Sequence, residues 1–152
     1  MEILNLKFCE EAFWPELATF FEDVKSNPYF HPHAFDWDTA LEILRYTGPD
    51  EYYVITETVN NKRIILGYGF LRGFNVWEDV CLGVIIHPKY QHKGLGRLVC
   101  QHLHCIGRMR GLSRIRLHVA QNNEKALNLY ESLGYLIHGQ RIDGELVCYK
   151  KL

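Results

Sequence analysis

Two glycines one residue apart, Gly94 and Gly96, open a segment with helical spacing that follows a short apolar run. A helix that begins directly after a strand and a glycine-bearing loop directs several unpaired N–H groups, and the positive end of its dipole, toward one point. Glycines let a ligand approach those amides, and Lys93 and Arg97 add positive charge beside them. The pattern predicts a site for a phosphate ester; a tight turn before a core helix is the alternative.

The spacing of the glycines separates this loop from two other phosphate-binding loops. The dinucleotide fingerprint G-x-G-x-x-G requires glycine at position 99, where the chain has Val99, and it should open the first strand–helix–strand unit. The loop G-x-x-x-x-G-K-[ST] requires lysine after its second glycine, but Gly96 is followed by Arg97. Both interpretations therefore fail.

The rest of the chain supplies the elements that would position this loop. Alternating or continuous apolar runs predict strands, and i, i+3, i+4 spacing predicts helices. Their order is one strand, two helices, three strands, a helix, a strand, a helix and two strands, which is a mixed α/β sheet with helices on its faces. The expected strands are 2–8, 51–59, 63–74, 79–86, 114–120, 135–140 and 145–152, and the expected helices are 15–25, 37–46, 95–110 and 124–133.

Composition limits the class of protein. Apolar residues make up 47% of the 152 residues and charged residues 23%, as in an average globular protein, so we expect one domain over residues 1–152. The 17 Lys and Arg against 18 Asp and Glu give no sign of a nucleic-acid partner. Because the sequence shows neither a long apolar segment nor a secretory signal, and its five cysteines are scattered, we expect a cytoplasmic protein without a membrane partner.

Two segments resemble the signature motifs of the GNAT superfamily of acetyl-CoA-dependent N-acetyltransferases. The run VIIHPKYQHKGLGRLV is similar to the family's strand, x-Pro-x-Tyr and Q/R-x-x-G-x-G/A, matched by Gln91, Gly94 and Gly96. The run LHVAQNNEKALNLYESLGY is similar to its second hallmark, with Asn123 and Tyr130 in place. The resemblance implies a central, mostly antiparallel, twisted sheet of about seven strands, flanked by four helices, with a V-shaped splay between strands 4 and 5.

The resemblance also implies how the cosubstrate acetyl-CoA is held. Its pantetheine arm would pair with the strand backbone at the splay, where a free N–H near Ile85 or Ile86 would polarise the thioester carbonyl. Its pyrophosphate would lie on the amides of the glycine loop, and the Tyr130 hydroxyl would donate a proton to the departing thiolate; a core aromatic is the alternative role for Tyr130. The expected coenzyme-binding residues are Val84, Ile85, Ile86, Gln91, His92, Lys93, Gly94, Leu95, Gly96, Arg97, Asn123 and Tyr130.

The implied reaction is direct attack by a primary amine, which needs a base because such an amine is protonated at neutral pH. Many family members carry a Glu in the strand matching 79–86, where this chain has no acidic residue after its first position. The candidate bases are Glu78, near the start of that strand, and His118, on the strand across the splay. A chain of water molecules is the third alternative.

The acceptor would bind near an aromatic and histidine-rich loop, through Tyr29, Phe30, His31 and His33. Aromatic faces stack on rings and imidazoles donate and accept hydrogen bonds, so the loop suits an amino sugar or sugar nucleotide. A hydrophobic plug over the core is the alternative. We expect no metal, because the histidines at 102 and 104 point apart on a helix and the pair at 31 and 33 lacks a third ligand.

The leading hypothesis is therefore an acetyl-CoA-dependent N-acetyltransferase whose partner is a small-molecule amine. One alternative is acetylation of a protein N-terminus or lysine. Another is a module that binds acyl-CoA without turnover. The sequence leaves the oligomeric state open, and a homodimer is compatible with it.

Overall fold

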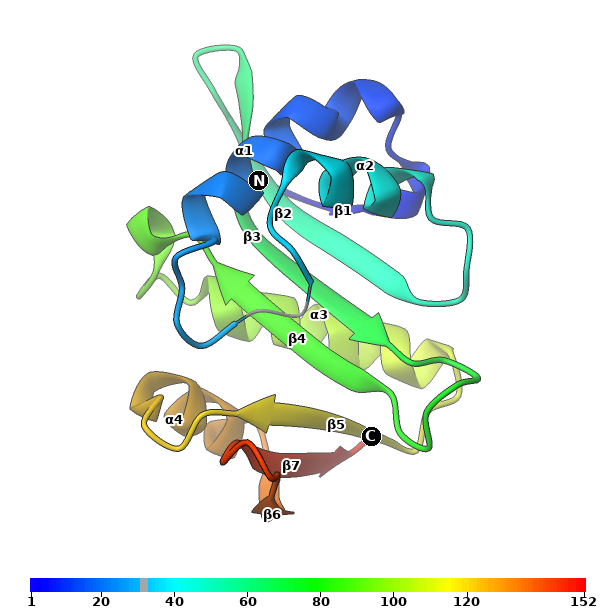
Figure 1. Ribbon diagram of the computed structural model, residues 1–152, viewed down its shortest axis with the longest axis vertical. Helices are drawn as coiled ribbons and strands as arrows, with labels where there is room; N and C mark the ends of the chain where they lie inside the picture. Colours follow the sequence, from blue (N-terminus) through cyan, green and yellow to red (C-terminus); the bar gives the residue numbers. More distant parts are fainter. Residues whose placement is uncertain (31–32) are drawn as a thin grey trace.

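The chain folds around one seven-stranded sheet with the strand order β1-β2-β3-β4-β5-β7-β6 (Figure 1). The structure is a computed structural model that describes residues 1–30 and 33–152. Neighbouring strands run antiparallel except β4 and β5, which are parallel. The strands are β1 Glu2–Asn5, β2 Glu51–Val59, β3 Lys62–Arg72, β4 Cys81–Ile86, β5 Arg114–Val119, β6 Leu136–Gln140 and β7 Leu146–Lys151. The predicted mixed α/β sheet and its order of elements are confirmed.

Helices cover both faces of the sheet (Figure 1). On one face α1 and α2 enclose a core that includes Phe21 and Tyr68, and on the other α3 and α4 enclose a core that includes Leu103 and Ile115. Within the described ranges, no helix is long and apolar enough to cross a membrane. The helices are α1 Trp14–Val24, α2 Trp37–Arg45, α3 Leu95–Met109 and α4 Glu124–Ser132, with short 3-10 helices at Leu6–Phe8, Glu11–Phe13 and Pro88–Tyr90.

The helix starts follow the capping residues in the sequence. Pro15 lies in the first turn of α1, where its missing N–H has no role. The Asp36 carboxylate accepts a hydrogen bond from the Thr39 amide at 2.8 Å and caps α2. Asn123 caps α4 through the Ala126 amide at 3.4 Å. The Asn123 cap fixes the start of α4.

Six of the seven predicted strands are shorter in the structure, and at three of them a polar contact marks the end. The first strand stops at Asn5, whose side chain accepts from the Lys7 amide at 2.9 Å and caps a 3-10 turn. The strand β3 stops before Gly73, which has φ +95° and donates to Asp50 Oδ1 at 2.8 Å. Asp79 was expected at the start of β4, but it lies before the strand and is held by the Arg114 guanidinium at 2.7 Å.

The parallel pair β4 and β5 separates soon after it meets. In the described part of the chain the two strands share one registered pair, Cys81 with Arg116, and the Arg116 amide donates to the Val80 carbonyl at 3.0 Å. On its other edge β4 stays paired with β3 as far as Ile86. The edge of β4 that faces β5 is therefore open from Val84 onward, which is the predicted V-shaped splay.

Candidate active site

Two cavities meet at the splay between β4 and β5. We call the first the α3 cavity, because the loop before α3 lines it together with the start of α4; its volume is about 830 Å³. We call the second the β7 cavity, because it is lined by residues of β3, β4, β5 and β7; its volume is about 840 Å³. A molecule in one can touch a molecule in the other, since the two share the lining residues Tyr29, Val84, Asn123, Ala126 and Tyr130.

The glycine loop forms one wall of the α3 cavity, and its two glycines serve different purposes. Gly94 has φ +80°, and a Cβ built on it would meet no atom within 4 Å. It thus provides a left-handed turn and leaves open space beside the backbone. A Cβ on Gly96 would lie 3.3 Å from Leu129 Cδ2, so this glycine lets α3 approach α4.

The first amides of α3 have no acceptor within the helix. The earliest helical hydrogen bond runs from the Leu98 amide to the Gly94 carbonyl at 3.1 Å. The N–H groups of Leu95, Gly96 and Arg97 therefore stay available, and all three residues line the α3 cavity. Free amides at a helix N-terminus, with open space beside Gly94, fit a phosphate or diphosphate group.

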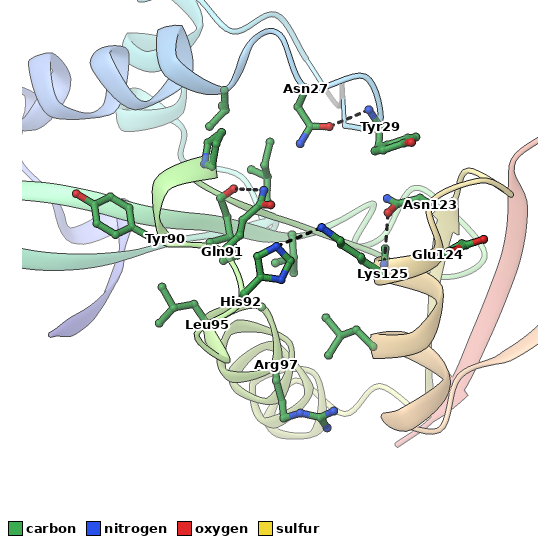
Figure 2. A pocket seen from close by; sticks show the side chains of 18 of the residues that line it. Asn27, Tyr29, Tyr90, Gln91, His92, Leu95, Arg97, Asn123, Glu124 and Lys125 are labelled. Atoms are coloured by element: carbon green, nitrogen blue, oxygen red, sulfur yellow. Dashed lines mark hydrogen bonds between the residues drawn. The ribbon is translucent and has the colours of Figure 1, made fainter.

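Side chains hold this loop in place and add charge to it (Figure 2). Gln91 Nε2 donates to the Ile86 carbonyl at 3.2 Å and ties the loop to the end of β4. His92 Nε2 lies 3.2 Å from the Lys125 ammonium on α4. Lys125 was not among the predicted residues, although its place two residues after the capping Asn123 could have pointed to it.

The two predicted cations of the loop each contact another side chain. The Arg97 guanidinium donates to the Ser132 hydroxyl at 2.6 Å, although Arg97 lines the α3 cavity. The Lys93 ammonium lies 5.8 Å from the centroid of the Tyr90 ring, and Lys93 is not among the lining residues. Lys125, by contrast, reaches from α4 to His92 in the loop.

The open edge of β4 presents backbone groups to both cavities. The His87 amide donates to the Leu66 carbonyl on β3 at 2.8 Å. Successive residues of a strand direct their N–H groups to opposite edges. The Ile85 amide therefore also points to β3, whereas the amides of Val84 and Ile86 point to the splay. The Gln91 side chain accordingly reaches the Ile86 carbonyl from that side.

Tyr130 lies at the junction of the two cavities and lines both. Its ring packs edge-on against Tyr135, with centroids 5.6 Å apart. Burial raises the pKa of the Tyr130 hydroxyl well above its usual range, so the hydroxyl stays protonated and can donate. Asn123, the other motif residue, also lies at the junction, where its side chain caps α4.

The two candidate bases differ in position. Glu78 is exposed in the turn before β4 and lines neither cavity. His118 lines the β7 cavity, but its Nδ1 lies 2.7 Å from an Arg141 guanidinium nitrogen. Burial, with Arg141 and Arg116 beside it, lowers the pKa of His118 to about 4. Since Nδ1 accepts from Arg141, the proton of the neutral ring is on Nε2, and His118 is a donor in this arrangement.

The strand position that could hold a carboxylate is filled by a ring. A Cβ on Gly83 would lie 2.2 Å from Phe70 Cζ, so the Phe70 side chain occupies the space above this residue of β4. Phe70 lines the β7 cavity as well. At this position of β4 the β7 cavity is therefore lined by the Phe70 ring and not by a carboxylate.

The predicted acceptor residues separate into two groups. Tyr29 lines both cavities and Phe30 lines the β7 cavity. His33 instead packs against Phe21 and Tyr68, at 5.4 and 5.7 Å between centroids, and lines neither cavity; burial lowers its pKa to about 4. His31 lies outside the described residues. The charged residues Arg72 and Arg116, together with Tyr149, also line the β7 cavity and were not predicted from the sequence.

The histidine pair on α3 points in two directions, as expected for i and i+2. His104 Nε2 lies 2.7 Å from the Tyr135 hydroxyl, while the His102 ring packs on Tyr53 at 4.6 Å between centroids. Within residues 1–30 and 33–152, no cluster of three or more His, Cys, Asp or Glu side chains could hold a metal ion.

Sequence comparison identifies relatives of known activity. Residues 11–135 match the model of the Acetyltransferase (GNAT) family. The ribosomal protein bS18-alanine N-acetyltransferase of Escherichia coli strain K12 is 38% identical over 58 residues, and the match covers 38% of this chain and 39% of that protein. The matched part is therefore less than half of the curated relative.

Solved structures share the fold over nearly the whole chain. A ribosomal-protein-alanine N-acetyltransferase from Brucella melitensis superposes with a TM-score of 0.78 at 18% identity, over 100% of both chains. A spermidine N-acetyltransferase from Vibrio cholerae, solved with CoA and spermine, gives 0.76 at 21% identity over 99% of this chain and 94% of that one. These two likenesses concern the fold. The family match over residues 11–135 shows that the chain belongs to the Acetyltransferase (GNAT) family.

Proposed function

We propose that this enzyme transfers the acetyl group of acetyl-CoA directly to a primary amine, with the coenzyme in the α3 cavity and the amine in the β7 cavity. The observation that carries the proposal is the junction itself. The two cavities share Tyr130 and the open edge of β4 at Val84. A thioester reaching the junction from one side would meet an amine arriving from the other.

Acetyl-CoA would be held by backbone groups more than by side chains. Its diphosphate would lie on the free amides of Leu95, Gly96 and Arg97, beside Gly94 and Lys125. Its pantetheine arm would take the place of a strand along Val84, Ile85 and Ile86. The Val84 and Ile86 amides, which face the splay, are the donors available to the oxyanion that forms on the acetyl carbonyl.

The chemistry needs one proton donor and one proton acceptor. The neutral amine nitrogen forms a bond to the acetyl carbon, and the carbon–sulfur bond breaks. The thiolate takes a proton from the Tyr130 hydroxyl, and the remaining extra proton on the attacking nitrogen returns to Tyr130 through water. Burial raises the pKa of that hydroxyl, so it is protonated before the reaction begins. The amine must lose a proton before attack, and water in the β7 cavity would accept it, because Glu78 is outside both cavities and His118 is a donor.

The preferred acceptor is a small amine that fits the β7 cavity. Tyr29, Phe30 and Phe70 line that cavity and give it aromatic faces suited to a ring such as that of an amino sugar. A protein N-terminus is the second candidate. It is favoured by the Escherichia coli relative, which is a ribosomal protein bS18-alanine N-acetyltransferase by name.

The test is thiol release from acetyl-CoA across a panel of an amino sugar, an amino-sugar phosphate, amino acids, a polyamine and a peptide with N-terminal alanine. Release with a small amine supports the preferred acceptor, and release with the peptide alone supports the second candidate. Tyr130→Phe should lower kcat by about tenfold or more and leave the Kd for CoA unchanged. The control is Tyr46→Phe, since Tyr46 lines neither cavity. Unchanged turnover in Tyr130→Phe would remove this residue from the mechanism, and no release with any amine would overturn the proposal.

A further inference from the structure

A row of four side chains crosses the floor of the β7 cavity. Arg72 on β3 is registered opposite Cys81 on β4, Cys81 opposite Arg116 on β5, and Arg116 opposite Tyr149 on β7. Residues that lie opposite each other in neighbouring strands share one face of the sheet. All four residues line the β7 cavity, and Cys81 lies between Arg72 and Arg116.

The two arginines are close enough to bind one group. Neighbouring strands lie about 4.8 Å apart, which puts the backbones of Arg72 and Arg116 about 10 Å from each other. An arginine side chain is long enough to cover half of that distance, and each guanidinium offers a planar set of donors suited to a carboxylate or phosphate.

Nearby arginines show what is different about Arg116. Arg114, two residues earlier on β5, makes two hydrogen bonds to the Asp79 carboxylate at 2.7 and 2.9 Å. Arg110 is paired with the Glu51 carboxylate. Arg116 is half-buried, and its Nε is a buried donor with no hydrogen-bond partner among the described residues. A buried guanidinium N–H without an acceptor is unfavourable, so a ligand that supplies the acceptor would be bound more tightly.

The described residues that line the β7 cavity carry a net positive charge. Arg141 lies 3.4 Å from Asp143, so these two balance each other in the turn between β6 and β7. Counted by charge alone, Arg72 and Arg116 then exceed the one remaining carboxylate, Glu145. A second positive charge on the acceptor would therefore be repelled, and a negative one attracted.

We propose that the amine acceptor carries an anionic group, a carboxylate or a phosphate ester, which binds Arg72 and Arg116 while the amine reaches Tyr130. This inference rests on the proposed function, since it assigns a substrate class to the same site. Tyr130 and both arginines line one cavity, so a molecule with an amine at one end and an anionic group at the other spans them. Polyamines and basic peptides are excluded as preferred acceptors by the same charges.

The experiment compares matched amines that differ in the anionic group. An amino sugar is set against its phosphate, and an α-amino acid against the corresponding amine without the carboxylate; the two pairs distinguish phosphate from carboxylate. For the preferred pair, the wild-type kcat/KM for the anionic member should exceed that for the neutral member by about tenfold or more, chiefly through a lower KM. Arg116→Met should reduce this ratio to near unity, and Arg116→Lys should keep part of it.

The control variant is Arg108→Met, which changes the net charge equally but lies on α3 outside the β7 cavity, and it should keep the wild-type ratio. The Kd for CoA reports whether each variant is folded. Equal kcat/KM for both members of each pair, or a preference for a polyamine, would overturn this inference and leave the proposed function intact. These wild-type comparisons decide the matter even where Arg116→Met does not fold. Absence of thiol release with every amine would instead overturn the proposed function, and this inference with it.

Discussion

The Lys125 ammonium lies 3.2 Å from His92 Nε2 and links the first turn of α4 to the loop before α3 (Figure 2). A cation at a helix N-terminus is unfavourable, because that end of the helix already carries partial positive charge. An anion bound in the α3 cavity, which Lys125 and His92 both line, would offset this cost. The pair thus marks where the coenzyme diphosphate is expected.

Replacing Lys125 should weaken coenzyme binding. Lys125→Gln removes a charge from the α3 cavity, and we expect the Kd for CoA to rise about fivefold at low salt and less at high salt, because exposed charges are screened. Calorimetric titration with CoA at two ionic strengths measures both effects. Lys93→Gln is the matched control, since Lys93 does not line the cavity. An equal loss in both variants would mean that overall charge, not the position of Lys125, sets the affinity.

The two glycines of the loop should respond differently to alanine. Gly94 has φ +80°, so Gly94→Ala strains the backbone by about 1 kcal/mol although its Cβ meets no atom. Gly94→Asn should cost less, because asparagine tolerates the left-handed region. Gly96→Ala places a Cβ 3.3 Å from Leu129 Cδ2, and the additional Leu129→Ala should relieve that contact. Urea unfolding of the four variants measures these differences, and equal losses for Gly94→Ala and Gly94→Asn would argue against a strained backbone.

Local patterns were enough to predict the order of the elements. The caps at Asp36 and Asn123 and the proline in the first turn of α1 are signals carried by a few adjacent residues, and each is where it was expected. Strand ends were predicted less well, because they depend on distant partners. Gly73 ends β3 by bonding to Asp50, and Asp79 leaves β4 to pair with Arg114, and neither partner can be read from a window around the strand.

In the candidate site, too, residues from one continuous stretch were predicted and residues from distant strands were not. The glycine loop is one continuous stretch, and its glycines, Gln91 and Arg97 all line the α3 cavity. His33 was expected to contact the acceptor because it lies in an aromatic loop, but its ring packs into the core against Phe21. The pairing of Arg72 with Arg116 in one cavity could not be predicted from the sequence. The two residues come to the same face, on either side of Cys81, only through the register of three strands.

The pH dependence of the reaction should show no titration of His118 near neutrality. Burial and two arginines lower the pKa of His118 to about 4, so it is already neutral throughout the range where the amine begins to lose its proton. We expect log kcat/KM to rise with a slope of about one until the pH approaches the pKa of the acceptor amine. Arg141→Gln removes a positive neighbour and should raise the pKa of His118 toward 6.5. An inflection near that value in the unmodified enzyme would instead identify His118 as a base.

The stability of the enzyme should decline in mild acid, in part through His104. Its Nε2 lies 2.7 Å from the Tyr135 hydroxyl, and burial, with Lys150 and Arg108 nearby, lowers its pKa from 6.5 to about 4. The unfolded chain therefore binds a proton at this residue between these pH values and the folded chain does not, so the free energy of unfolding falls as the pH drops from 6.5 toward 4. His104 alone contributes up to about 3 kcal/mol to this change.

His104→Gln separates this effect from general acid sensitivity. Glutamine can still accept from the Tyr135 hydroxyl but does not titrate, so we expect a loss of about 1 kcal/mol near neutral pH and a shallower decline below it. Urea unfolding at about pH 7.5 and about pH 5 gives both values. His138→Gln is the matched control, because His138 is exposed on β6, and it should keep the wild-type slope. A slope in His104→Gln as steep as that of the wild type would show that other groups govern the acid response, with the buried His33 the next to be replaced.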